Sequence, residues 1–291
     1  MKIFLTGASG FLGINFLKKI IGNENIDRIY CLCRSQLSVT DEKIIWIKSD
    51  INKINELEIN DNIDIVINFA AFLKYESMKM FKEVNVKGTE RIICFCKNNG
   101  IKKIIHCSTI NVKLKNKGGY ATTKLQAEKL IENSGLSYII VRPALIYGPL
   151  DRGLNKMIVS AKKFNCIPVF GNGKYLQQPI YIDELVSFFE KIIFCDLEGI
   201  VLELGGEEQL SYIDIINCIG KILNKKVYPI KIPSKIMLMV LTIIEFFRIP
   251  FILRREQIYQ ITEDLVCQNE IKTSEFLVKQ NRFEENLRKY I

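Results

Sequence analysis

One histidine, His106, and one tryptophan are present among the 291 residues. A single histidine excludes a histidine-rich metal site and any catalytic scheme that needs two imidazoles. The nine cysteines form no CxxC pair, and the nearest spacings, Cys31-x-Cys33 and Cys94-x-Cys96, lie inside apolar runs. We interpret them as buried thiols in a reducing compartment, so neither a zinc site nor a disulfide framework is expected.

The sequence offers no apolar leader, because Lys2–Leu5 already has the pattern of a strand. We therefore expect a cytoplasmic protein.

The most apolar stretch, 236–247, has 12 residues, and a bilayer span needs about 20. We favour a buried helix of a small lobe; a homodimer contact and a membrane-surface docking face are the alternatives. The cations that would suit a membrane surface are Lys231, Lys235, Arg248, Arg254 and Arg255.

The formal net charge of +9 is concentrated in the first half of the chain. Residues 1–150 hold 22 Lys and Arg against 14 Asp and Glu, whereas residues 151–291 hold 19 against 18. The positive electrostatic field of such a charge excess suits an anionic ligand. A general bias of the composition toward lysine would produce the same excess. We expect no nucleic-acid partner, because no recognition motif accompanies the charge.

Short apolar runs alternate with stretches of helical spacing through the first 150 residues. This alternation predicts an α/β protein with a Rossmann-like, doubly wound parallel sheet. The runs are apolar throughout, as expected of strands covered on both faces. The predicted strands are Lys2–Leu5, Arg28–Cys33, Lys43–Ile47, Ile63–Phe69, Lys103–Cys107 and Ser137–Val141, and the predicted helices are Phe11–Ile21, Met78–Asn98 and Tyr120–Ser134.

After Pro149 the alternation of apolar runs and helical stretches becomes less regular, and this part of the chain contains a glycine-rich loop, Phe170–Lys174. The later segments predict a smaller, mostly helical C-terminal substrate lobe, formed by about 151–177 and 206–291. Residues 1–150 and about 178–205 would form the Rossmann-like domain. Ile180–Ile182 and Ile200–Leu204 are predicted to add two strands to the sheet, and Tyr212–Leu223, Ser234–Phe247 and the tail Glu256–Ile291 are predicted to be helical.

A glycine loop follows the first predicted strand directly, in the order Thr6-Gly7-Ala8-Ser9-Gly10-Phe11-Leu12-Gly13. Gly7 permits a tight turn, Gly10 lets the backbone approach a pyrophosphate, and Gly13 lets the helix pack on the strand. The N-terminus of the helix would then face the phosphates. Strand, loop and helix together predict dinucleotide binding, which the glycine spacing alone would not.

The end of the second predicted strand bears on the choice of cofactor. A carboxylate there would bind the ribose 2′-hydroxyl of NAD, whereas an arginine would bind the 2′-phosphate of NADP. This sequence has no acid there and continues with Arg34 and Ser35. We favour NADP over NAD; a solvated surface Arg34 is the alternative.

Further motifs follow the glycine pattern in order along the chain. They are Asp50, Asn68-Phe69-Ala70-Ala71, Asn85-Val86-Lys87-Gly88-Thr89, Tyr120-x-x-x-Lys124 and Arg142-Pro143 through Tyr147-Gly148-Pro149. With them, the chain resembles the extended and atypical short-chain dehydrogenases/reductases, the NAD-dependent epimerase/dehydratase family, over most of residues 1–225. The resemblance implies cofactor contacts from Gly7, Ser9, Gly10, Phe11, Leu12, Gly13, Arg34, Asp50, Ile51, Ala70, Ala71, Asn85, Lys124 and Pro143.

Tyr120 and Lys124 are four residues apart, so on a helix they share one face. A nearby ammonium stabilises a phenolate and lowers the pKa of the tyrosine. Tyr120 could then exchange the proton of an alcohol while a hydride moves to or from a nicotinamide. The resemblance implies that Lys124 also holds the nicotinamide ribose and that Thr109, with Ser108 beside it, orients the substrate hydroxyl.

Two departures from the family pattern concern the substrate. The short loop Asn111–Gly119 carries Lys113, Lys115 and Lys117, which would either clamp a substrate phosphate or be solvated. Where sugar-nucleotide enzymes of this family usually have a diphosphate-binding arginine, this chain has Gln177-Gln178-Pro179.

We therefore carry two functional hypotheses. The first is an epimerase, dehydratase or reductase acting on a hydroxyl or carbonyl carbon, most plausibly of a nucleotide sugar or related sugar. The second is an NAD(P)H-binding structural or regulatory module resembling the accessory subunit of respiratory complex I. Tyr120 and Lys124 favour the first hypothesis, and the missing arginine favours the second.

Overall fold

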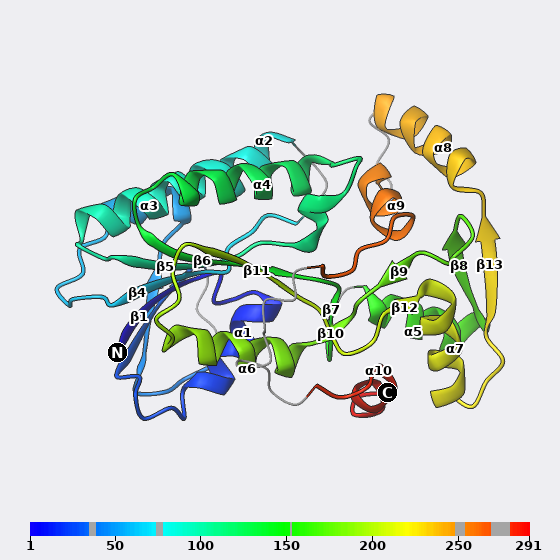
Figure 1. The fold of residues 1–291 in the computed structure, drawn as a ribbon, viewed down its shortest axis with the longest axis horizontal. Coiled ribbons are helices and arrows are strands. Elements are labelled where there is room, and N and C mark those ends of the chain that lie inside the picture. Colours follow the sequence, from blue (N-terminus) through cyan, green and yellow to red (C-terminus); the bar gives the residue numbers. More distant parts are fainter. Residues whose placement is uncertain (35–38, 74–77, 152, 248–253, 269–279) are drawn as a thin grey trace.

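The computed structural model describes residues 1–34, 39–73, 78–151, 153–247, 254–268 and 280–291. Its centre is a seven-stranded parallel sheet in the order β11-β6-β5-β4-β1-β2-β3 (Figure 1). This confirms the predicted doubly wound architecture. The strands are β1 (Lys2–Thr6), β2 (Arg28–Cys33), β3 (Ile44–Lys48), β4 (Ile65–Asn68), β5 (Lys103–Cys107), β6 (Ser137–Pro143) and β11 (Ile200–Leu204).

The central strands are buried on both faces, which explains why they read as continuous apolar runs. In β1, Ile3 and Leu5 contribute to one hydrophobic cluster, and Phe4 between them contributes to another. All three side chains are inaccessible to solvent. Because successive side chains of a strand point to opposite faces, each face needs its own covering layer.

Helices supply those two layers (Figure 1). On one face lie α1 (Phe11–Ile20) and α6 (Ile182–Ile193), which contact each other. The other face carries α3 (Gly88–Asn98) and α4 (Gly119–Glu132). Helix α3 continues from α2 (Met78–Phe81) through a π-helical turn, Lys82–Lys87, so the predicted helix 78–98 is one uninterrupted helical stretch. Two 3-10 turns, Ile51–Glu56 and Ile110–Lys113, follow β3 and β5.

A second group of elements lies at the far end of the molecule (Figure 1). Three short ladders pair strands that are distant in sequence: β7 (Ile146–Tyr147) with β10 (Ile180–Tyr181), β8 (Cys166–Phe170) with β13 (Tyr228–Ile232), and β9 (Leu176–Gln177) with β12 (Leu210–Ser211). The helices are α5 (Leu154–Phe164), α7 (Tyr212–Ile222), α8 (Ser234–Phe246), α9 (Arg255–Ile261) and α10 (Phe283–Arg288).

The prediction that Ile180–Ile182 adds a strand to the main sheet is wrong. Ile180 and Tyr181 pair with β7 outside that sheet, and Ile182 already begins α6. Pro179 precedes them and has no N–H to donate to a ladder. Asp183 and Glu184 lie in the first turn of α6, where acidic side chains favour a helix start. Only two residues are therefore left for the strand.

The prediction of a helical tail over Glu256–Ile291 is wrong as a continuous helix. The described part contains α9, then irregular backbone after Ile261, then α10. Leu265 donates its N–H to Leu176 O at 2.8 Å, and Leu176 N donates to an Asp264 carboxylate oxygen at 2.7 Å. These bonds satisfy the backbone without helix formation. Residues 269–279 of the predicted tail lie outside the described residues.

The glycine at position 13 offers a test of the packing between α1 and the turn after β1. A Cβ on Gly13 would lie 2.7 Å from Ala8 Cα and inside contact distance of Gly7 O. We expect Gly13→Ala to lower the free energy of unfolding by about 1–3 kcal/mol, the usual cost of overpacking. Gly22→Ala is the matched control, because nothing lies within 4 Å of its Cβ. Urea unfolding measures both, and equal effects would contradict the packing role of Gly13.

Candidate active site

The carboxyl ends of the parallel strands form the edge at which α/β proteins bind ligands, and the sheet order reverses between β1 and β4. The turn after β1 meets the turn after β4 there. Gly7 has φ of +71°, and a Cβ on it would lie 2.5 Å from Phe69 C. Gly10 donates its N–H to Gly7 O at 2.9 Å, while Ser9 and Gly10 are exposed to solvent. The N-terminus of α1, which begins at Phe11, therefore lies at this edge of the sheet, with Leu12 half-buried in its first turn.

Arg34 and Asp50 reach the same edge from the next two strands. Arg34 follows β2 and is exposed. Asp50 follows β3, and its carboxylate accepts the N–H of Asn52 at 2.9 Å, which starts the turn Ile51–Glu56. Ile51 is buried against Gly88, where a Cβ would meet its Cδ1 at 3.0 Å.

The loop after β4 carries the half-buried Ala70 and Ala71 and is tied to α4 by Asn85. Asn85 is buried; its amide oxygen accepts Phe72 N–H at 2.8 Å, and its amide nitrogen donates to Thr123 Oγ1 at 3.1 Å. Both ends of the Asn85 amide therefore hold the loop against the helix.

Tyr120 and Lys124 lie one turn apart on α4, as the spacing predicted. Tyr120 is half-buried, and its ring centroid lies 6.3 Å from that of Phe81. The start of α4 is held from the other end of the chain, because the Glu256 carboxylate of α9 accepts the N–H groups of Gly119 and, at 3.3 Å, Tyr120. An acid at a helix N-terminus satisfies otherwise unpaired donors. Sequence reasoning missed Glu256, since no local pattern connects residues 136 positions apart.

Lys124 is almost fully buried. Its Nζ lies 2.7 Å from Cys107 O and 2.9 Å from His106 Nε2. Burial lowers the pKa of Lys124 to about 8, although Cys107 and Glu128 act in the opposite direction. Burial and the neighbouring Lys124 also hold the pKa of His106 well below its ordinary value. The single histidine of the chain is thus part of the site, which sequence reasoning did not foresee.

Ser108 and Thr109 follow β5 and have different partners. Ser108 Oγ donates to the Glu128 carboxylate, which also receives Arg142 Nη2 at 2.6 Å. Arg142 precedes Pro143, the last residue of β6. Thr109 Oγ1 accepts Asn111 N–H at 3.2 Å and so starts the turn Ile110–Lys113. Ser108 therefore belongs to a buried ionic network behind α4.

That network continues to the lysine-bearing loop. Glu203 of β11 pairs with Lys113 at 3.0 Å and lies 3.8 Å from Arg142 Nη1. Lys117 donates to Leu114 O at 2.8 Å, whereas Lys115 extends into solvent. The side chains of two of the three loop lysines thus have partners within the described part of the protein.

The two glutamines at the position of the usual diphosphate arginine bind the end of α9 and the chain that follows it. Gln177 donates to Gln260 O at 3.3 Å and to Glu263 O at 3.2 Å. Gln178 donates to Gly206 O at 2.8 Å and accepts Cys267 N–H at 2.9 Å. Both side-chain amides are therefore used in packing this segment.

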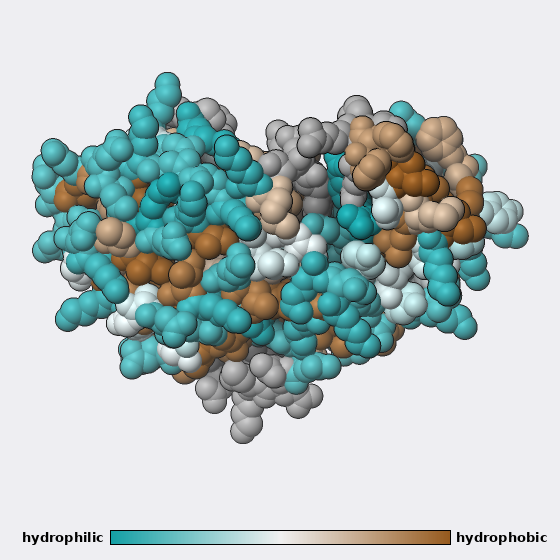
Figure 2. All heavy atoms as spheres, turned by 90° about the horizontal axis from the view of Figure 1, so that it is seen from above, coloured by the Kyte–Doolittle hydropathy of each residue, from teal (hydrophilic) through white to brown (hydrophobic). Residues whose placement is uncertain are grey.

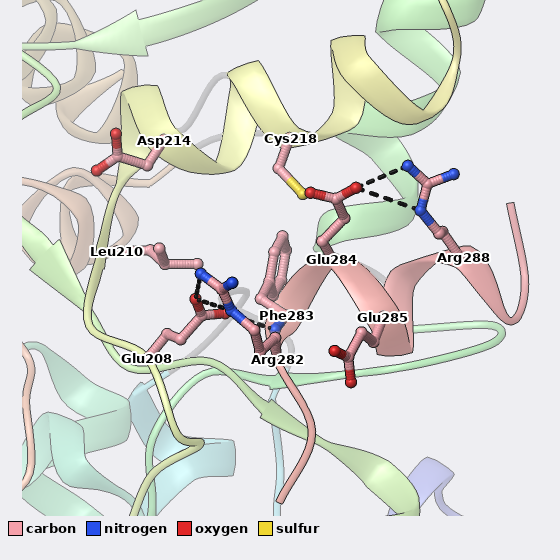
Figure 3. Close-up of a pocket in the computed structure, with 9 residues that line it drawn as sticks. All are labelled: Glu208, Leu210, Asp214, Cys218, Arg282, Phe283, Glu284, Glu285 and Arg288. Atoms are coloured by element: carbon pink, nitrogen blue, oxygen red, sulfur yellow. Dashed lines mark hydrogen bonds and ion pairs between the residues drawn. The ribbon is translucent and has the colours of Figure 1, made fainter.

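A separate pocket lies between α7 and α10 (Figure 3). Four of its charged side chains form ion pairs, Arg282 with Glu208 and Arg288 with Glu284. No group of three or more His, Cys, Asp or Glu side chains that could hold a metal occurs in the described part of the chain. All nine cysteines are free thiols.

Comparison with known proteins gives a consistent family assignment. The model of the NAD dependent epimerase/dehydratase family matches residues 3–195. The chain is similar to a trifunctional UDP-glucose 4,6-dehydratase, 3,5-epimerase and reductase of Arabidopsis thaliana, with 27% identity over 264 residues, covering 77% of this chain and 40% of that protein. The chain thus spans about two-fifths of the length of this relative and of two similar proteins from the same plant.

Two further comparisons bear on fold and function. The structure resembles dTDP-glucose 4,6-dehydratase from Streptomyces venezuelae, solved with NAD bound, with a TM-score of 0.78, 17% identity and 99% and 95% of the two chains covered. The sequence is also similar to subunit 9 of the NADH dehydrogenase 1 alpha subcomplex of Dictyostelium discoideum, with 27% identity over 223 residues, covering 73% of this chain and 61% of that protein.

Proposed function

Because the chain belongs to the NAD dependent epimerase/dehydratase family, we propose that it is a nicotinamide-dependent enzyme acting on a hydroxyl or carbonyl carbon of a nucleotide sugar or related sugar. The observation that carries this proposal is the position of Tyr120 and Lys124. They lie on one helix at the same sheet edge as the glycine turn. Relatives named for UDP- and dTDP-sugar chemistry support the substrate class.

The residues at the crevice fit a dinucleotide. Gly7 leaves the backbone bare where the turns after β1 and β4 meet, and the start of α1 supplies N–H groups to phosphates. Asp50 and Arg34 would lie at the adenosine end, and Ala70, Ala71 and Pro143 along the cofactor toward Lys124. When bound, the nicotinamide accepts or returns a hydride at a sugar carbon.

The remaining steps belong to residues of this chain. Thr109 orients the sugar hydroxyl, and Tyr120 takes its proton as the carbon is oxidised or returns the proton as the carbonyl is reduced. Lys124 stabilises the phenolate of Tyr120 electrostatically. The hydrogen bonds from Glu256 fix the first turn of α4 and with it the backbone of Tyr120.

The second candidate is a cofactor-binding module with little or no turnover, resembling the respiratory complex I subunit. The use of Gln177 and Gln178 in internal packing favours it, because the diphosphate arginine of many sugar-nucleotide enzymes has no counterpart there. Retention of both Tyr120 and Lys124 favours an enzyme, and the first test below separates the two candidates.

We expect Tyr120→Phe to lower kcat by about 10²–10⁴-fold, the usual contribution of a positioned acid or base, with cofactor affinity retained. Turnover of a panel of UDP- and dTDP-sugars, combined with cofactor titration, measures both quantities. Tyr228→Phe is the matched control, because Tyr228 is exposed on β13. Turnover near the wild-type level in Tyr120→Phe would refute the assignment of this residue. Absence of turnover in the wild type, with cofactor bound, would favour the binding module.

For the cofactor we propose a preference for NADP over NAD. Arg34 is the exposed cation that follows β2, where the adenosine ribose binds in this fold, and no carboxylate accompanies it. A guanidinium there would bind the 2′-phosphate through charge-assisted hydrogen bonds.

Arg34→Ala should therefore weaken NADP binding by roughly 10- to 100-fold, corresponding to about 1.5–3 kcal/mol for a charged hydrogen bond. NAD binding should change little. Calorimetric titration of both cofactors against the variant measures the difference, with Arg288→Ala on α10 as the control. An equal loss for both cofactors, or none, would contradict the role of Arg34.

We further propose that α8 docks on an anionic membrane surface. Its buried side packs through Leu241 against Phe170 and Ile258. Apolar side chains of the same segment gather on the surface (Figure 2). They are Ile236, Met239, Val240, Ile243, Phe246 and Phe247, and each is at least 38% exposed. Lys231 and Lys235 are exposed beside this face, and a basic rim suits anionic lipid. None of the described helices is long and apolar enough to cross a bilayer.

In a flotation assay at low salt, the protein should rise with vesicles containing phosphatidylserine and not with neutral vesicles. The double variant Met239→Glu/Ile243→Glu should stay at the bottom, while Val159→Glu, a change at an exposed position of α5, should float like the wild type. Failure of the wild type to float would dispose of the membrane proposal. Dissociation of a dimer by the double variant would instead assign the face to a second copy of the chain.

A further inference from the structure

A chain of buried hydrogen bonds runs behind the catalytic helix, from Asn68 through His106 to Lys124. Asn68 and His106 are register partners on the neighbouring strands β4 and β5. The amide oxygen of Asn68 accepts Thr6 Oγ1–H at 2.7 Å and Ala70 N–H at 3.1 Å. A backbone N–H can only donate, so this oxygen must face Ala70. The amide nitrogen of Asn68 is thereby directed at His106.

The orientation of Asn68 determines the tautomer of His106. The amide nitrogen of Asn68 lies 3.0 Å from His106 Nδ1 and can only donate a hydrogen bond. Nδ1 must therefore be the unprotonated acceptor. Since burial keeps the imidazole uncharged, its single proton resides on Nε2.

His106 Nε2 carries a proton and lies 2.9 Å from Lys124 Nζ. An ammonium group has three donors and no lone pair, so it cannot accept this proton, whereas a neutral amine can. The same amine can donate to Cys107 O at 2.7 Å. We infer that Asn68 and His106 favour the neutral amine of Lys124 over its ammonium form, which makes His106 a positioning residue for Lys124.

The surroundings of Lys124 agree with this arrangement. Burial disfavours its ammonium form. The Cys107 thiol beside it is uncharged at neutral pH, because burial raises the pKa of that thiol to about 11. The Glu128 carboxylate, one turn along α4, favours the ammonium but is engaged by Arg142 and Ser108. Tyr120 lies one turn earlier on the same helix.

If the proposed function is correct, the protonation state of Lys124 also matters to Tyr120, because only the ammonium form stabilises a phenolate electrostatically. An ammonium cannot accept the proton of His106 Nε2–H, so protonation of Lys124 breaks this hydrogen bond. The hydrogen-bond chain itself does not depend on the proposed function.

The tautomer can be observed directly, because His106 is the only histidine in the sequence. Protein labelled with ¹⁵N-histidine will give one imidazole, whose two nitrogen shifts report which nitrogen carries the proton. We expect Nε2 protonated, Nδ1 bare, and no imidazolium between about pH 6 and 9. A proton on Nδ1, or charging of the imidazole in this range, would overturn the inference.

Asn68→Asp tests the control that Asn68 exerts over Lys124. A carboxylate accepts the proton of Nδ1–H, so Nε2 becomes the acceptor and favours the ammonium of Lys124. The wild-type Nε2 signal should titrate with Lys124, with a midpoint near pH 8, and Lys124→Met should abolish that titration. The midpoint should rise by at least one pH unit in Asn68→Asp.

Asn98→Asp adds the same charge at an exposed position of α3 and should leave the midpoint unchanged. An unchanged midpoint in Asn68→Asp would overturn the role of Asn68 and His106. If Asn68→Asp does not fold, the wild-type tautomer decides the inference alone. Neither measurement uses turnover, so failure of the proposed enzyme activity is detected separately.

Discussion

The contact between the turn after β1 and the turn after β4 is the constraint on which the remaining site depends. At Gly7 a side chain has no room, because Phe69 C and Ala70 N lie where its Cβ would be. This approach brings the loop containing Ala70 against the start of α1. It also fixes Asn68, whose amide oxygen receives the Ala70 N–H. The glycine turn before α1 and the polar chain toward Lys124 therefore meet at the same contact.

Buried polar groups connect this contact to α4. Asn85 joins the loop after β4 to Thr123, and Glu128 joins α4 to Arg142 on β6. Such groups are costly to bury without partners, so each fixed bond restricts its neighbours. The acceptors for the first N–H groups of α4 come from Glu256, far along the chain. Tyr120 and Lys124 are thus held by both the sheet and the C-terminal elements.

The sequence predicted those parts that local chemistry determines. Apolar runs identified the strands of the main sheet, the glycine loop identified the tight turn between β1 and α1, and the spacing of Tyr120 and Lys124 placed both on one helix. The pairing of strands that are distant in sequence could not be predicted from local patterns. The β8–β13 ladder joins segments about 60 residues apart. The Ile180–Ile182 strand was misassigned because a two-residue strand cannot be distinguished from the start of an apolar helix by its pattern.

The partners of the site residues were the least predictable feature. Asn68 was noted only as part of a motif and His106 only as a lone histidine, because their contact requires the register of two strands separated by more than 30 residues. Glu256 carried no local signal at all. The predicted cofactor contacts remain predictions, because they depend on a molecule that binds to the protein. The predicted boundaries of the substrate lobe remain predictions as well.

The central claim is that this crevice supports reversible hydride transfer between a nicotinamide and a sugar. Absorbance of reduced nicotinamide, followed after rapid mixing of cofactor-loaded protein with UDP- and dTDP-sugars, tests it most directly. The account predicts a change in the redox state of the cofactor with at least one sugar, lost on removal of the Tyr120 hydroxyl. A firmly bound cofactor whose redox state never changes across the panel would contradict the account.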